Sequence, residues 1–153
     1  MSEIFTIVCE NVAVSAVQDI LAAYAAATKK LRCLGIELAA NGQTTVGNYP
    51  IRLRRAEATV TPGTGGTTPT PNNVNPGGAA ASFTAHANDT SQATAGTVID
   101  VVASQFNPIN GYYWEPPTRG EPPGADLSDA FILSLDGAPS GINVSATMWL
   151  EEI

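Results

Sequence analysis

The stretch INVSATMWLEE, residues 142–152, predicts a β-strand with one face in a protein core. Every second side chain is apolar, and polar residues stand between them except at Trp149; the apolar set is Ile142, Val144, Ala146, Met148 and Leu150. Because successive side chains of a strand point to opposite faces, this period of two buries one face and leaves the other toward solvent.

Similar short segments recur along the whole chain. They are mostly rich in β-branched or aromatic residues and are bounded by Gly, Pro, Asn or Asp. The segments are EIFTIVCE, LRCLGIEL, PIRLRRAEATV, ASFTAHA, TVIDVVAS, GYYWEPP and AFILSLDG. About eight or nine short strands joined by Gly/Pro turns predict one all-β domain over residues 1–153, an antiparallel β-sandwich that we expect to be jelly-roll-like.

Residues 13–33, AVSAVQDILAAYAAATKKLRC, fit either a helix or a strand. The alanines favour a helix, and Ala16, Ile20, Tyr24 and Ala27 fall at helical spacing. Strands of a sandwich are often continuously apolar, however, and the segments on both sides read as strands. We therefore predict a strand around Gln18 to Tyr24.

The net charge and the hydropathy of the chain argue against two classes of partner, nucleic acids and membranes. The chain has 153 residues, a mass of 15.8 kDa and a net charge of −7. Its single basic cluster (Lys29, Lys30, Arg32, Arg52, Arg54 and Arg55) could form one patch, but an acidic balance disfavours contact with a phosphate backbone. No apolar run approaches the ~20 residues of a membrane helix. We expect a soluble protein that binds neither nucleic acid nor membranes.

Cys9 and Cys33 fit neither a disulfide framework nor a metal site, because two cysteines without a histidine pair cannot supply four zinc ligands. Two buried free thiols are the expectation. We also expect no cofactor.

The segment TPGTGGTTPTPNNVNPGG, residues 61–78, contains one sizeable apolar side chain, Val74. It is too polar to pack a core, its prolines hold parts of it extended, and its glycines let it bend. A loop of this length is usually either solvated or functional. We predict an extended loop, with a solvated loop and an arm that reaches a neighbouring subunit as the two alternatives.

Candidate catalytic groups are sparse. GTGGTT lacks the lysine and the following helix of a phosphate-binding loop, and the single histidine, His86, has no nucleophile motif beside it and reads as an ordinary strand residue. The carboxylates Asp126, Asp129 and Asp136 are close in sequence and could ligate a hard cation or act as an acid/base pair, although solvated loop acids are the default. We predict no catalytic set.

The cluster Tyr112, Tyr113 and Trp114 lies beside a proline-rich turn. Adjacent residues of a strand face opposite sides, so at least one ring points away from the core unless both faces are covered. Core packing, a protein interface and a sugar platform all fit an aromatic cluster of this kind.

Three blocks of the chain resemble small proteins encoded in tailed-bacteriophage genomes: EIFTIVCENVAVSAVQDILAAYA, EATVTPGTGGTTPTPNNVNPGGAAASFTAHANDTSQATAG and FNPINGYYWEPPTRGEPPGADLSDAFILSLDGAPSGINVSATMWLEE. The resemblance covers most of the chain, and the middle block is its most specific part. It implies a virion structural protein, best read as a head decoration (cement) protein. Such proteins are usually trimeric and clamp the major capsid protein on the outside of the phage head.

Three functions remain open. The first is a non-enzymatic decoration protein of the capsid surface that forms a homotrimer. Its expected contact residues are Phe5, Ile7, Thr64, Thr67, Pro69, Pro71, Val74, Tyr112, Tyr113 and Trp114. The second is a virion- or tail-associated carbohydrate-binding module, which needs an exposed, coplanar aromatic pair. The third is a small hydrolase, which needs two of the carboxylates of residues 126–136 facing one cleft.

Overall fold

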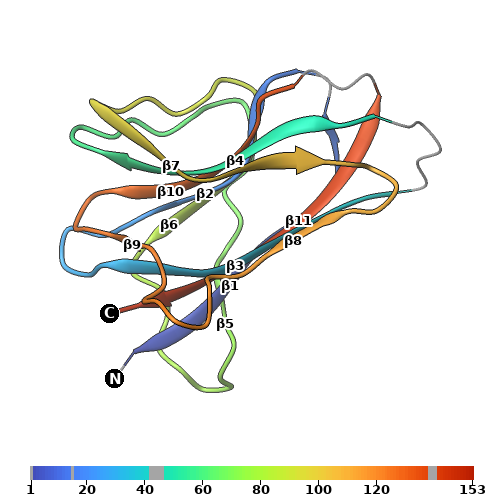
Figure 1. Ribbon diagram of the computed structural model, residues 1–153. Coiled ribbons are helices and arrows are strands. Elements are labelled where there is room, and N and C mark those ends of the chain that lie inside the picture. The colour runs from blue at the N-terminus through green and yellow to red at the C-terminus, as the bar shows by residue number, and fades with distance from the viewer. Residues whose placement is uncertain (1, 15, 42–46, 138–140) are drawn as a thin grey trace.

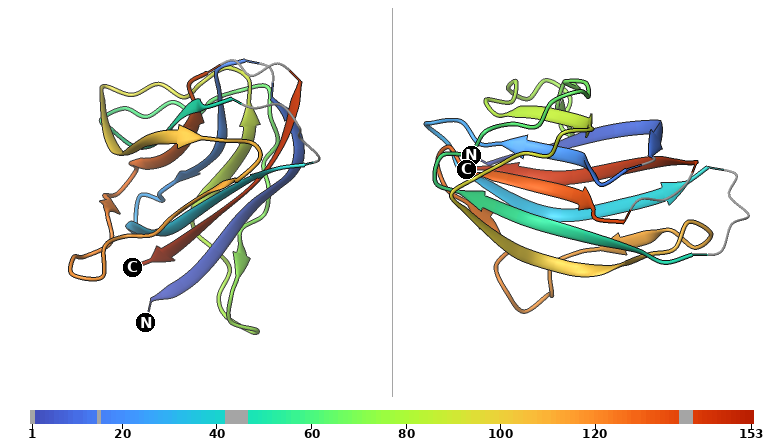
Figure 2. Two further views of the ribbon diagram at one scale, coloured as in Figure 1. Left: turned by 45° about the vertical axis from the view of Figure 1, so that its right-hand side comes forward. Right: turned by 90° about the horizontal axis from the view of Figure 1, so that it is seen from above.

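The computed structural model describes residues 2–14, 16–41, 47–137 and 141–153, which form eleven strands in two sheets that pack against each other (Figure 1, Figure 2). Sheet A has the order β5-β1-β11-β3-β8, with β9 also paired to β3; its strands are β1 (Glu3–Val14), β3 (Leu31–Ala40), β5 (Asn72–Asn73), β8 (Tyr112–Trp114), β9 (Gly124–Ala125) and β11 (Ile142–Glu152). Sheet B has the order β6-β2-β10-β4-β7; its strands are β2 (Gln18–Tyr24), β4 (Tyr49–Glu57), β6 (Thr84–Asp89), β7 (Thr97–Phe106) and β10 (Ala130–Leu135). The strand pairs are antiparallel, so the predicted all-β antiparallel sandwich is confirmed.

β11 lies inside sheet A between β1 and β3. The alternate residues from Ile142 to Leu150 are buried in the core, as the period of two predicts. Trp149 lies on the other face, opposite Gly35 of β3. A Cβ atom at Gly35 would lie 3.2 Å from the carbonyl oxygen of Trp114 and 3.6 Å from the Trp149 ring, so glycine lets these strands pass close together.

The main core fills the space between the two sheets. Phe5 of β1 packs edge-on against Phe83, with ring centroids 5.5 Å apart, and Phe106 and Phe131 are fully buried. Both chain ends lie at one end of sheet A, where Glu3 pairs with Glu152 (Figure 1).

β2 confirms the predicted strand at Gln18 to Tyr24, and every residue in it is buried. Its inner face joins the main core, whereas Ala22 and Tyr24 belong to a second apolar cluster on the outer face of sheet B. The strand is therefore covered on both faces, and its small alanines fit between the two layers. Because both faces are buried, its sequence is continuously apolar and also resembles that of a helix.

The chain between β4 and β7 forms that outer cover. Two of its segments, residues 58–67 and 90–96, are called the strap here. The strap is held together in antiparallel fashion by the Thr61–Thr94 and Thr64–Ser91 bridges and by a hydrogen bond from Gly96 N–H to the Ala58 carbonyl oxygen at 2.7 Å. Its apolar side chains Val60, Ala93 and Ala95 pack on the second cluster.

Residues 61–78 lie against their own chain along much of their length. The first part belongs to the strap, Thr67 pairs with Ala87 on the outer side of β6, and Asn72 and Asn73 form β5 on the edge of β1. The segment thus runs from sheet B to the edge of sheet A (Figure 1).

Candidate interaction surfaces

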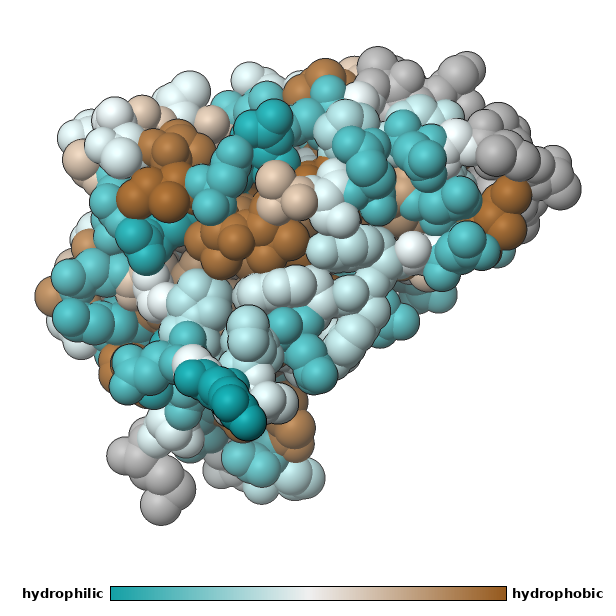
Figure 3. All heavy atoms as spheres, in the orientation of Figure 1, coloured by the Kyte–Doolittle hydropathy of each residue, from teal (hydrophilic) through white to brown (hydrophobic). Residues whose placement is uncertain are grey.

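β7 forms one edge of sheet B and pairs with β4 on one side only. An edge strand presents unpaired N–H and C=O groups that another strand can use. Val98 and Ile99 on this ten-residue strand are 49% and 39% exposed. Apolar side chains reach the surface among polar ones on the face that carries β7 (Figure 3). This edge has the chemistry of a strand-pairing surface.

The charges beside β7 neutralise one another. Arg52 Nη1 lies 2.8 Å from Asp100 Oδ2, and Arg52 Nε lies 2.8 Å from Asp136 Oδ2. Arg54 contacts the same two aspartates at 3.3 and 2.5 Å. The other four members of the basic cluster also have acidic partners: Lys29 with Glu152, Lys30 with Asp126, Arg32 with Glu121 and Glu151, and Arg55 with Glu57. The basic cluster therefore does not form an unpaired cationic patch.

The aromatic cluster is divided between two faces of sheet A. Tyr112 and Trp114 are partly buried and pack against the core, whereas Tyr113 is 59% exposed. The Tyr113 hydroxyl donates to Glu115 Oε2 at 3.0 Å, and this hydrogen bond, together with nearby negative charge, raises the pKa of Tyr113. Its ring meets Trp149 at 6.5 Å and 72°, edge to face. That pair is not coplanar, so it does not meet the geometric condition for a flat sugar platform.

The structure places the expected contact residues of the first strand inside the subunit. Phe5 and Ile7 are fully buried in the main core, so they have no surface to offer a partner, and the expectation that they form a subunit contact is not met by this geometry. On the opposite face of β1, Val8 is 42% exposed. Residues on both faces of this strand are largely apolar, so its sequence does not show which face the second sheet covers.

The expected contact residues of the loop remain at the surface. Thr64 and Thr67 are exposed, Pro69 and Pro71 are half-buried, and Val74 is 52% exposed. Their backbone, however, is partly engaged by the same chain: the Thr67 and Ala87 amides each donate to the other residue's carbonyl oxygen at 2.9 and 2.8 Å. Contact with a neighbouring subunit would therefore use these side chains, because part of the backbone is already hydrogen-bonded within the same chain.

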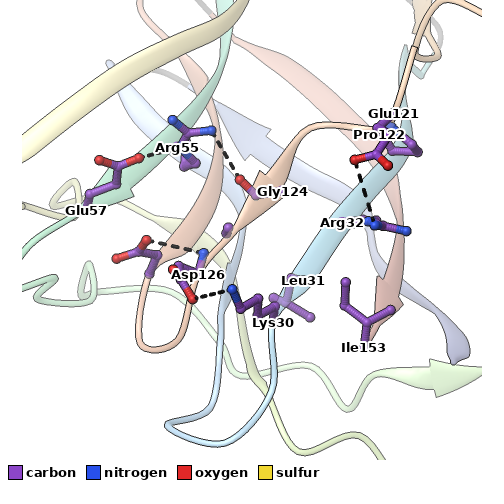
Figure 4. A pocket seen from close by; sticks show the side chains of 12 residues that line it. Lys30, Leu31, Arg32, Arg55, Glu57, Glu121, Pro122, Gly124, Asp126 and Ile153 are labelled. Atoms are coloured by element: carbon purple, nitrogen blue, oxygen red, sulfur yellow. Dashed lines mark hydrogen bonds and ion pairs between the residues drawn. The ribbon is translucent and has the colours of Figure 1, made fainter. Parts of the chain in front are cut away.

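A pocket of about 400 Å³ lies where β3, β4 and β9 meet (Figure 4). Asp126 and Asp129 line it, but Asp136 lies with Arg52 and Arg54 instead. Lys30 Nζ is 3.1 Å from Asp126 Oδ1, and the Asp129 carboxylate accepts the Asp126 N–H at 3.2 Å. The Leu127 N–H and Lys30 lower the pKa of Asp126, the opposite direction to that of a general acid. Asp126 and Asp129 therefore stabilise the turn at residues 126–129 by hydrogen bonds.

Two carboxylates that sequence reasoning overlooked lie beneath the strap. Asp19 of β2 and Asp89 of β6 are register partners in sheet B, and each is 2% exposed. Asp19 accepts the Ala93 N–H at 2.7 Å and the Gln92 side-chain amide at 3.2 Å. Burial raises the pKa of Asp19 to about 6, and the charge of Asp89 acts in the same direction.

Asp89 holds the other half of the strap. Its Oδ1 accepts the Gly66 N–H at 3.2 Å, and its Oδ2 lies 3.0 Å from His86 Nδ1. The Gly63 N–H donates to the Tyr24 hydroxyl at 3.3 Å, and burial raises the pKa of Tyr24 to about 12. Two of the three glycines of GTGGTT, Gly63 and Gly66, thus donate their amides to side chains of sheet B. The spacing of His86 and Asp89 was visible in the sequence, but their pairing with Asp19 was not, because 70 residues separate the two aspartates.

The cysteines match their expectation. Cys9 and Cys33 are free and buried, and burial raises their pKa values to about 11 and about 12. Among the described residues, no cluster of three or more His, Cys, Asp or Glu side chains could hold a metal ion. No helix able to cross a membrane occurs in the described part of the chain.

No protein-family model, curated protein or solved structure matches this chain.

Proposed function

We propose that this chain is a non-enzymatic virion structural protein of a tailed bacteriophage, a capsid decoration protein that acts through contacts with itself and with the major capsid protein. The proposal combines the sequence resemblance described above with the architecture of the sandwich. The strand order is the structural observation that carries it.

The strand order supports the jelly-roll version of the sandwich. In a jelly roll of eight strands, strands 1, 8, 3 and 6 lie side by side in one sheet and strands 2, 7, 4 and 5 in the other. When β5, β6 and β9 are set aside, the orders β1-β11-β3-β8 and β2-β10-β4-β7 follow that scheme. Viral capsid domains are among the proteins built this way, and lectin domains are too, so the support from the fold is an analogy.

Exposed apolar side chains and a free strand edge support the proposal that the protein assembles with other subunits. β7 offers a free strand edge with exposed Val98 and Ile99, and its flank is neutralised by ion pairs. Val74 and Tyr113 add exposed apolar area elsewhere. Interfaces are distinguished by few unpaired charges and by apolar or aromatic anchors, which these surfaces provide. We propose β7 as the principal contact and a homotrimer as the assembled form.

The decisive experiment is quantitative mass spectrometry of purified virions of a phage that encodes the chain. We expect hundreds of copies per particle, scaled against the major capsid protein. A second arm measures co-sedimentation of the recombinant protein with capsids that lack it. The Val98→Lys variant is expected to bind at least tenfold more weakly, and Val17→Lys, which changes a 40% exposed valine outside β7, serves as the matched control. A protein absent from virions refutes the proposal, whereas equal binding by both variants refutes only the assignment of β7.

A further inference from the structure

The strap is attached to sheet B by two carboxylates that lie next to each other. Asp19 and Asp89 face each other across β2 and β6, and each accepts a backbone N–H from a different segment of the strap, Ala93 and Gly66 respectively. Directly opposite residues on neighbouring antiparallel strands have Cβ atoms about 5 Å apart. Ionising both carboxylates in this nearly unexposed place is unfavourable, chiefly because burial penalises each charge and further because the two charges repel each other.

Neighbouring side chains and backbone groups offset only part of the free-energy cost of keeping both carboxylates charged. Several groups face the pair. His86 of β6 contacts Asp89, and Asp19 is faced by Tyr24 from its own strand, Gln92 and the Ala93 N–H from the strap, Arg54 from β4 and Ser134 from β10. Arg54 is shared with Asp100 and Asp136, and the buried Ser134 hydroxyl has no hydrogen-bond partner among the residues that the structure describes. Among the described groups that face the pair, Arg54 is the one arginine and no lysine is present.

We propose that the strap is a proton-operated cover: Asp19, buried next to Asp89, retains its proton while the strap is closed on sheet B, and loss of that proton between mildly acidic and mildly alkaline solution loosens the strap. Loosening uncovers the apolar cluster beneath it, formed by Ala22, Tyr24, Ala56, Ala130 and Ile132. The proposal concerns the free subunit and is independent of the proposed function.

The direction and size of the effect follow from linkage. A group whose pKa is raised in the closed form binds its proton more tightly there, so the closed form is favoured at low pH and loses that advantage as the pH rises. The pKa of Asp19 is raised from 3.8 to about 6. If the open form restores the ordinary value, the ratio of open to closed strap rises roughly tenfold between pH 5 and pH 8.

The test is amide hydrogen exchange of the intact protein at pH 5, 6.5 and 8, corrected for the intrinsic exchange rate at each pH. The probes are the strap amides of Thr61, Thr64, Ser91 and Thr94, which are hydrogen-bonded within the strap, with amides of β11 as the reference for global unfolding. We expect strap protection to fall about tenfold from pH 5 to pH 8 while β11 changes less.

Variants separate the buried pair from general charge effects. Asp19→Asn keeps the shape and an acceptor for Ala93 but has no proton to lose, so its strap protection should be flat with pH. Asp100→Asn removes an acid from the same face of sheet B, one whose side chain is 39% exposed, and should retain the wild-type dependence. Asp89→Asn removes the neighbouring charge but leaves Asp19 buried, so it should weaken the pH dependence without abolishing it, and it serves as the test should Asp19→Asn fold poorly. Flat protection in the wild type, an unchanged tenfold dependence in folded Asp19→Asn, or a steeper dependence in Asp89→Asn overturns the proposal.

Discussion

Replacing Gly63 by alanine tests whether the strap is seated on sheet B as described. A Cβ atom there would lie 2.6 Å from the Ser91 carbonyl oxygen, 2.7 Å from Asp89 Oδ2 and 2.9 Å from Asp89 Cβ. Backbone and a buried carboxylate cannot move aside as a flexible side-chain end can. The strap must therefore shift away from β6.

The expected cost comes from two sources. Overpacking of a tight site costs about 1–3 kcal/mol, and the shift weakens the hydrogen bond from the Gly63 N–H to Tyr24, worth about 1 kcal/mol. We expect Gly63→Ala to lower the free energy of unfolding by about 2–4 kcal/mol. At roughly 2–4 °C per kcal/mol for a chain of this size, the Tm should fall by about 5–15 °C.

The matched control is Gly120→Ala. The nearest atom to a Cβ there is the Pro117 carbonyl oxygen at 4.0 Å, so the substitution meets open space. It should be neutral or stabilising by less than about 1 kcal/mol, because alanine reduces the entropy of the unfolded chain. The assay is urea unfolding of both variants, with thermal melts in parallel. If Gly63→Ala is as stable as Gly120→Ala, the packing of the strap against Asp89 is wrong.

Three further outcomes are expected. The Asp19→Asn variant should exceed the wild type in free energy of unfolding by about 1–3 kcal/mol at pH 8, and the gain should shrink below pH 5, because the wild type is then protonated; a gain that grows on acidification contradicts the raised pKa. Cys9 and Cys33 should resist alkylation at pH 8 until urea unfolds the chain, and a reductant should leave the Tm unchanged; a drop of several degrees would reveal a disulfide. Light scattering at micromolar concentration should give a trimer that Val98→Lys, unlike Val17→Lys, shifts toward monomer; a wild-type monomer removes the main support for self-assembly.

The sequence alone determined the class of the fold and several of its elements. The period of two in residues 142–152 depends only on the alternation of side chains along a strand, so it holds wherever that strand lies. The strand at Gln18 to Tyr24 was also predictable, from its strand-like neighbours rather than from its own composition. The free, buried thiols of Cys9 and Cys33 were also predictable, because two cysteines without a disulfide framework favour that state.

Only the tertiary structure decided which faces are covered and which distant residues meet. Phe5 and Ile7 look the same in sequence whether a second sheet or a partner covers them, and only the packing of sheet B on β1 buries them inside the subunit. Asp19 and Asp89 read as two unrelated acids until the pairing of β2 with β6 places them side by side under the strap. Local patterns report how a residue alternates within its own strand, whereas strand pairing, and with it the partners of each buried charge, is set by the global energy of packing two sheets and a cover together.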